Sequence, residues 1–177
     1  MTSPPATAVR TAEGAIAFTD LSGFTEFCAI KGDEAAVALI SAQERLLRDE
    51  IGRRGRIVKN LGDGFMLFFA DPCDAVVAGL SLQDKFEEAS FEGDFPLWVR
   101  IGIHFGAPVR HGRDLVGHDV NVAARIVDLA APGEVLVSAS ATSAMTRRIP
   151  NVAFEEVGPV IMKGIPEAMT LYRAMRA

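Results

Sequence analysis

Two aspartates stand at the ends of predicted strands, and together they could hold metal ions. Asp20 closely follows the apolar run AIAF, and Asp63 lies in the turn LGDG that precedes the run GFMLFF. If these strands are neighbours, the two carboxylates meet at one end of a sheet, where their repulsion raises a pKa or recruits cations. Paired carboxylates that hold two hard divalent ions suit in-line phosphoryl chemistry. Taken alone, Asp-Gly is also an ordinary turn sequence.

The residues that follow Asp20 could bind phosphate groups. Ser22, Gly23, Phe24 and Thr25 open a short predicted helix directly after the strand. The first turn of a helix offers unpaired backbone N–H groups and the positive end of the helix dipole, which together can hold phosphate oxygens. An ordinary strand-to-helix turn has the same pattern, so this segment alone does not establish a site.

A third polar group lies in the stretch DLVGHDVNVAAR. Asn121 and Arg125 are four residues apart on a predicted helix, so they share one face of it. Asn can orient a ribose, and Arg can stabilise charge that builds on a phosphoryl group. A capping Asn and a solvated Arg are the alternative. The histidines, His104, His111 and His118, share no ligand spacing and predict no metal site.

The composition limits the class of protein. With 177 residues, 49% of them hydrophobic, the chain is long enough for one domain with a sizeable core. We expect a flexible tail at residues 1–14 and a single domain at 15–177. No apolar run approaches a membrane span and no signal peptide is evident, which predicts a cytoplasmic protein. The net charge of -5 argues against nucleic-acid binding by a general basic surface.

The elements that must position these residues alternate along the chain. A buried strand at 15–18 leads into a short helix, and a longer helix from Asp33 is expected to bury Val37, Ile40, Leu47 and Ile51. Two strands flank the turn LGDG, and a helix begins at Pro72. A strand at 97–105 and a second strand precede a helix at 119–130, and strand candidates follow at 134–138, 152–158 and 170–175. This order predicts an antiparallel-rich α+β sheet with helices packed on one face.

The polar positions together resemble the catalytic domain of class III nucleotidyl cyclases, of the adenylyl cyclase type. The similarity runs from AIAFTDLSGFT through IVKNLGDGFMLFF and RDLVGHDVNVAARI to IMKGIPEAMTLYR, so it covers nearly the whole chain. The resemblance implies a ferredoxin-like βαββαβ core. It also implies that two copies associate head to tail and that each active site is built from both.

The resemblance implies that one half of each site binds metal and phosphate. Asp20 and Asp63 match the two metal-binding aspartates of the family, with the Leu21 carbonyl as a further ligand for two divalent ions, Mg²⁺ or Mn²⁺. Residues 22–25 then lie against the phosphates.

The other half of the site is implied to come from the partner copy. Lys59 and Asp114 match the pair that reads adenine. Asn121 matches the residue that orients the ribose, and Arg125 matches the residue that stabilises the transition state. Lys163, in the sequence MKG, matches the lysine that reaches the triphosphate.

The implied reaction converts ATP to 3',5'-cyclic AMP and pyrophosphate in a homodimer. Lys59 and Asp63, although four apart in one hairpin, would then serve opposite sites. Two alternatives are a guanylyl cyclase, which would have an acidic and a small residue in place of Lys59 and Asp114, and a non-catalytic cyclase-like module. The second would lack a member of the polar set, and the sequence contains all of them.

Overall fold

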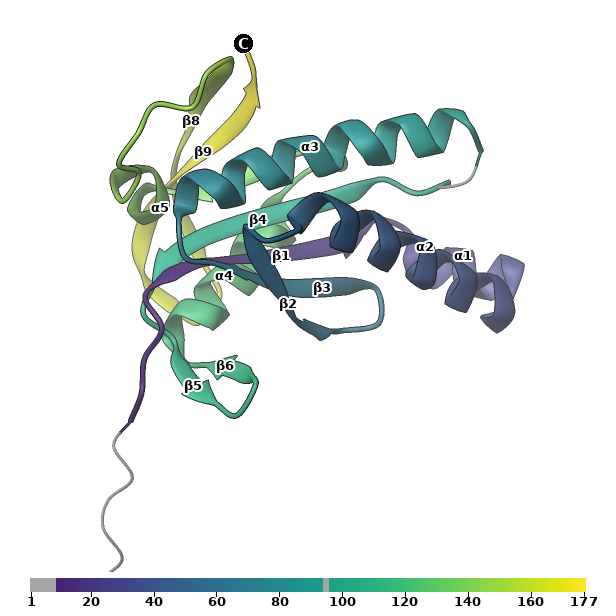
Figure 1. Ribbon diagram of the computed structural model, residues 1–177, viewed down its shortest axis with the longest axis horizontal. Helices are drawn as coiled ribbons and strands as arrows, with labels where there is room; N and C mark the ends of the chain where they lie inside the picture. The colour runs from purple at the N-terminus through teal and green to yellow at the C-terminus, as the bar shows by residue number, and fades with distance from the viewer. Residues whose placement is uncertain (1–8, 94–95) are drawn as a thin grey trace, which may run out of the picture.

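The computed structural model describes residues 9–93 and 96–177, and a seven-stranded sheet forms its centre (Figure 1). The strand order is β2-β3-β1-β4-β7-β9-β8, and among these pairings β4 with β7 is the parallel one. The sheet strands are β1 (Gly14–Leu21), β2 (Gly55–Asn60), β3 (Gly64–Phe69), β4 (Val99–Gly106), β7 (Val135–Ser138), β8 (Val152–Met162) and β9 (Ile165–Arg176). A separate hairpin consists of β5 (Val109–His111) and β6 (Asp114–Val116).

The helices and strands together form the predicted βαββαβ arrangement. The helices are α1 (Phe24–Lys31), α2 (Asp33–Ile51), α3 (Pro72–Phe91), α4 (His118–Leu129) and the short α5 (Ala139–Ser143). From β1 to β4 the chain alternates as βαββαβ, with α1 and α2 in the first helical position and α3 in the second. The ferredoxin-like α+β fold predicted from the sequence is therefore confirmed.

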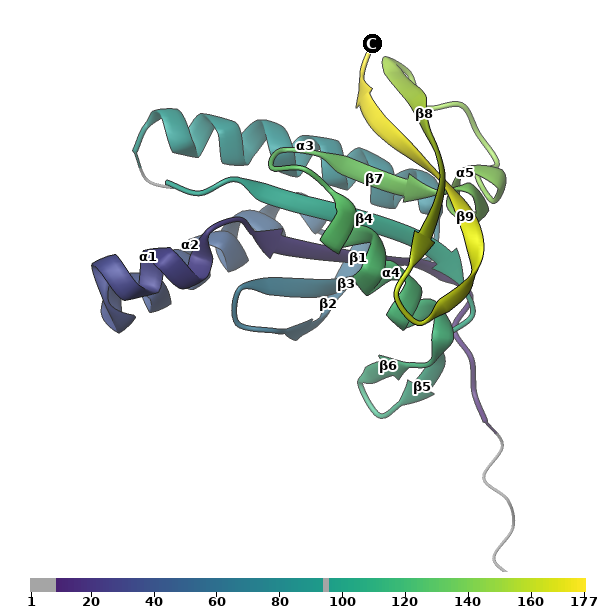
Figure 2. The same ribbon diagram turned by 180° about the vertical axis from the view of Figure 1, so that it is seen from behind.

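Helices cover both faces of the sheet, so the prediction that they pack on one face is wrong. On β1, Ala15 and Ala17 belong to the main core with α2 and α3, whereas Ile16 and Phe18 pack with residues of α4. Figures 1 and 2 show α2 and α3 on one side of the sheet and α4 on the other. Because both faces are covered, the side chains of β1 and β3 are buried almost without alternation.

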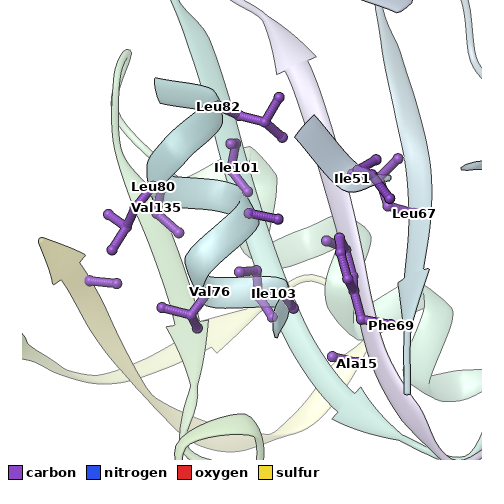
Figure 3. Packing of buried hydrophobic residues seen from close by; sticks show 14 of the residues in the cluster. Ala15, Ile51, Leu67, Phe69, Val76, Leu80, Leu82, Ile101, Ile103 and Val135 are labelled. Atoms are coloured by element: carbon purple, nitrogen blue, oxygen red, sulfur yellow. The ribbon is translucent and has the colours of Figure 1, made fainter. Parts of the chain in front are cut away.

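The larger core lies between α3 and the central strands. Val76 and Leu80 of α3 pack over β4 and β7, where Ile101, Ile103 and Val135 are almost completely buried (Figure 3). The helix begins as predicted, because the Asp71 side chain accepts a hydrogen bond from the Cys73 N–H at 2.8 Å and Pro72 occupies the first turn.

The helix α2 buries a slightly different stripe from the predicted one. Leu47 and Ile51 are buried and Ile40 packs against the core, but Val37 is 62% exposed. The buried stripe at the start of this helix runs through Ala36 and Leu39 instead. The helix packs against both α1 and α3, and the inward face of its first turns is one position earlier than the sequence pattern suggested.

The backbones of α4 and β4 come into direct contact at one point. At Gly102 of β4, an added Cβ would lie 2.4 Å from the backbone nitrogen of Val127 in α4, which is closer than real contacts allow. Glycine is therefore required for this approach of backbone to backbone. The position of α4 is set by β4 directly.

The start of the described chain runs beside the small hairpin. Thr11 forms a bridge with Val109, and the Ala12 N–H donates to the Pro108 carbonyl at 2.9 Å. The predicted flexible tail overlaps these residues, and its first part, residues 1–8, lies outside the described residues. Within the described ranges, every helix is too short or too polar to cross a membrane.

Candidate active site

The first group of predicted site residues meets at one end of the sheet. Strand β1 pairs with β3 so that Asp20 lies opposite Gly64, next to Asp63. The Leu21 N–H donates to the Asp63 carbonyl at 2.9 Å, which ties the turn before β3 to the end of β1. Burial, and then the negative charge of Asp20, raise the pKa of the Asp63 carboxyl. The structure thus places the two carboxylates together, as the sequence predicted.

A glycine allows this close approach. A Cβ on Gly64 would lie 1.8 Å from the carbonyl oxygen of Thr19, so only glycine fits between the turn and β1. The Thr19 hydroxyl adds a hydrogen bond from the Phe65 N–H at 3.1 Å. Together these contacts hold Asp63 against the end of β1.

The two aspartates open into a cavity of about 600 Å³. Residues 21–26, which run from the end of β1 into the first turn of α1, line it together with Arg100, Asp128 and Pro132. Gly23 precedes α1 with a φ of 76°, a left-handed conformation that favours glycine. The start of this helix therefore faces the carboxylates across the cavity, which is the placement expected of a phosphate-binding turn.

Sequence reasoning missed Arg100, which the structure places in the same cavity. Its Nε donates to Asp20 Oδ2 at 2.9 Å, and its Nη2 donates to the same oxygen. Arg100 lies directly opposite Asp20 in the β1–β4 register. The sequence signal was an arginine in the middle of an apolar strand, but its partner could be identified only once β4 was known to lie beside β1.

The donor atoms at this end of the sheet fit hard divalent ions. Asp20 and Asp63 provide carboxylate oxygens, the ligands that Mg²⁺ and Mn²⁺ prefer. Across residues 9–93 and 96–177, no group of three or more His, Cys, Asp or Glu side chains could hold a metal ion. A metal bound here would therefore complete its coordination with backbone carbonyls such as that of Leu21, with water and with phosphate oxygens.

A second group of predicted residues lines a different cavity. Asn121, Arg125 and Lys163 surround a space of about 280 Å³ between α4 and the turn that joins β8 to β9. Met162 and Ile165, on either side of that turn, are buried in a cluster that includes residues of α4. This packing holds Lys163 beside the helix.

The members of this second group do not line the cavity of the aspartates. Arg125 is about half exposed, and its Nη1 lies 3.2 Å from Asp128 Oδ2, one helical turn away. Asp128 lines the aspartate cavity, so its contact with Arg125 links the two regions. A single copy therefore presents two separate sets of polar residues.

The third predicted pair is in contact. Lys59 Nζ donates to Asp114 Oδ2 at 2.8 Å, joining β2 to β6. This hydrogen bond is the main reason that the pKa of Asp114 is lowered, and the Leu115 N–H contributes by donating to the same carboxylate. The carboxylate is therefore ionised at neutral pH and acts as a hydrogen-bond acceptor.

The repulsion at the aspartates predicts an effect on stability. In metal-free buffer at pH 7, Asp63→Asn is expected to raise Tm by about 1–3 °C. The pKa of Asp63 is raised in the fold, so its ionisation destabilises the folded state as pH increases, and Asn cannot ionise. The gain should vanish below about pH 4, where the carboxyl is protonated in both states.

Thermal unfolding followed by circular dichroism across this pH range measures the change. Glu156→Gln, on an exposed part of β8, is the control and should leave Tm unchanged. A lower Tm for Asp63→Asn at pH 7 would contradict this account of the carboxylate pair.

Comparisons with known proteins identify the family of the chain. The family model described as the adenylate and guanylate cyclase catalytic domain matches residues 7–175. The pH-sensitive adenylate cyclase MT1302 of Mycobacterium tuberculosis (strain CDC 1551 / Oshkosh) is 31% identical over 163 residues, covering 91% of this chain. The chain spans 40% of the length of that relative.

Solved structures share the fold. The adenylyl cyclase CyaB from P. aeruginosa has a TM-score of 0.84 and 21% identity, with 97% of each chain covered. The guanylate cyclase domain of RhGC from Catenaria anguillulae has a TM-score of 0.82 and 17% identity, covering 94% of this chain and 98% of that one. One is named an adenylyl and the other a guanylate cyclase, so the fold does not decide the base.

Proposed function

Because the chain belongs to the adenylate and guanylate cyclase catalytic domain family, we propose that it is an adenylyl cyclase that converts ATP to 3',5'-cyclic AMP and pyrophosphate. The observation that supports adenine over guanine is the Lys59–Asp114 pair. Lys59 can donate to N1 of adenine, and the ionised Asp114 can accept from the 6-amino group. Guanine presents the reverse pattern at these atoms, with a donor at N1 and an acceptor at position 6.

Product analysis tests the choice of base. Purified protein is incubated with ATP or GTP and Mn²⁺, and the products are separated by chromatography. Cyclic AMP as the main product supports the proposal, whereas cyclic GMP as the main product would assign a guanylyl cyclase. Absence of both from folded protein would favour a non-catalytic module.

The separation of the polar residues supports a shared site. Within one chain, Asp20 and Asp63 lie in one cavity, and Asn121, Arg125 and Lys163 lie in another. A head-to-tail homodimer would bring the aspartates of one copy to the second set of its partner, which gives two equivalent sites about a twofold axis. The first set contains the aspartates that would hold metal, and the second contains the Asn, Arg and Lys that the proposal assigns to the ribose and the phosphates.

Each residue has a distinct task in the proposed reaction. Two divalent ions held by Asp20 and Asp63 would lower the pKa of the ribose 3'-OH and neutralise the leaving pyrophosphate. Asn121 orients the ribose, and Arg125 neutralises charge on the α-phosphoryl oxygens. The task of holding the triphosphate falls to Lys163 from the partner.

Two further groups assist on the metal side. The N–H groups of residues 23–25, at the start of α1, would face the phosphates, whereas the Ser22 N–H donates to the Trp98 carbonyl at 2.8 Å. Arg100 is already bonded to Asp20, so it offers a fixed positive charge where the phosphates would enter. We assign it to the same half of the site as the aspartates.

A change of two residues should alter base selectivity. Lys59→Glu combined with Asp114→Cys is expected to reduce the kcat/KM for ATP at least tenfold and to permit measurable use of GTP, because the hydrogen-bonding pattern is inverted. Initial rates with each nucleotide measure the ratio. Arg53→Gln, in the exposed turn before β2, is the control and should leave the ratio unchanged. If the double variant keeps the parent's ATP to GTP preference, these residues do not read the base.

A further inference from the structure

A buried histidine joins the start of α4 to the sheet. His104 of β4 is 4% exposed, and its Nδ1 lies 2.9 Å from Ser138 Oγ and 3.1 Å from Ser140 Oγ. Its Nε2 lies 3.2 Å from Asp119 Oδ1, in the first turn of α4. The second carboxylate oxygen of Asp119 accepts from the Ala107 N–H at 2.9 Å. One imidazole thus connects four elements of the fold.

The hydrogen-bond partners select one form of this ring. Burial lowers the pKa of His104, although Asp119 opposes the shift, so the ring is neutral at pH 7. An ionised carboxylate only accepts, so Nε2 carries the proton and donates to Asp119. Nδ1 therefore accepts, and the Ser138 hydroxyl is its donor, because the Ser140 hydroxyl donates to the Phe105 carbonyl at 3.0 Å.

Asp119 is the side chain that anchors the beginning of α4. The helix follows Gly117, which has no side chain to cap it. Asp119 fills the space that a Cβ on Gly106 would occupy, since that atom would lie 2.2 Å from the carboxyl carbon. Asn121 is two residues later on the same helix, and Arg125 follows one turn after that. A rotation of the first turn would therefore redirect Asn121, whereas Arg125 lies beside the part of α4 that rests on Gly102.

We propose that His104 is a positioning residue of the cyclase reaction: through its bond to Asp119 it fixes the start of α4, and so the direction of Asn121. The inference rests on the proposed function. His104 acts without touching the nucleotide. Its loss should therefore damage only the half of the site that α4 contributes and leave the aspartate half intact.

Two replacements separate this role from general packing. His104→Asn reaches the position of Nδ1 but not that of Nε2, so the bond to Asp119 is lost. His104→Gln can place its amide nitrogen near Nε2 and restore that bond. We expect kcat to fall about tenfold or more in the Asn variant, with KM for ATP changed by less than about threefold. The Gln variant should recover most of kcat.

Mixed dimers locate the defect. When subunits of two variants pair at random, about half of the dimers are mixed. If the two defects lie in opposite halves of the site, each mixed dimer has one intact site of two, so the mixture has about a quarter of the parent's activity. The activity of His104→Asn mixed with Asp20→Ala should rise toward this quarter, because the two defects lie in opposite halves of the active site. His104→Asn mixed with Arg125→Ala should show no rise, because both defects lie in the half supplied by α4.

Each outcome decides the matter. The expected result is that activity recovers in the mixture with Asp20→Ala and not in the mixture with Arg125→Ala, and that His104→Gln restores most of kcat. Full activity of His104→Asn, recovery with both partners, or recovery with neither would overturn the inference. The pair Asp20→Ala and Arg125→Ala is the control: if it fails to recover, the shared-site proposal is wrong, and the kcat comparison of Gln with Asn then decides the role of His104 by itself.

Discussion

Asp20→Ala and Arg125→Ala proteins are each expected to retain less than about 1% of the parent's cyclic AMP formation, and a mixture of the two to recover about a quarter of it. Each homodimer has both sites damaged, since Asp20 belongs to one half of the site and Arg125 to the other. In a mixed dimer one site collects both defects and the other collects neither. The measurement is cyclic AMP formed by each variant alone and after co-expression.

A matched mixture controls this experiment. Asp20→Ala with Asp63→Ala should show no recovery, because both aspartates line the same cavity and every mixed site keeps one defect. Activity of the parent should also fall on dilution, as dimers dissociate. If the Asp20 and Arg125 mixture stays inactive although mixed dimers are present, both residues act within one chain and the shared site is refuted.

Removal of divalent ions is expected to lower turnover to the background of the assay, at least about a hundredfold, without unfolding the protein. Asp20 is already paired with Arg100, so the sheet end does not need a metal to hold its charge. Turnover is measured after chelation and after addition of Mn²⁺ or Mg²⁺, and Tm is recorded in parallel. Restored turnover with unchanged folding is the expected result. Substantial cyclase activity in metal-free buffer would contradict the roles given to Asp20 and Asp63.

Much of this site could be predicted from the sequence because its residues stand at the ends of strongly patterned elements. The runs AIAF and GFMLFF predict two strands, and if these strands are neighbours, as the structure shows them to be, Asp20 and Asp63 meet at one end of the sheet. A spacing of four on a helix predicts the common face of Asn121 and Arg125. These inferences depend on local geometry, which the sequence pattern records directly.

The roles that sequence patterns did not reveal depend on which elements, distant in the sequence, lie side by side in the fold. Arg100 and His104 occupy alternate positions of β4, on the side opposite Val99, Ile101 and Ile103, and the pattern marks them only as polar. Their roles require that β4 lies beside β1 and that α4 covers this face of the sheet. Strand order and helix side are set by the whole fold, so no short window of sequence contains them.

The direct contact between Gly102 and α4 has a mechanical consequence for the proposed dimer. Arg100 and Gly102 are on one strand, and Arg125 is on the helix whose backbone touches that strand at Gly102, with no side chain between the two backbones at that point. Any displacement of β4 is therefore passed to α4 as movement of a rigid body. Within each subunit, Arg100 would serve one active site and Arg125 the other. A shift caused by nucleotide in the first site would thus be felt in the second, and the two sites of the dimer would move as one unit.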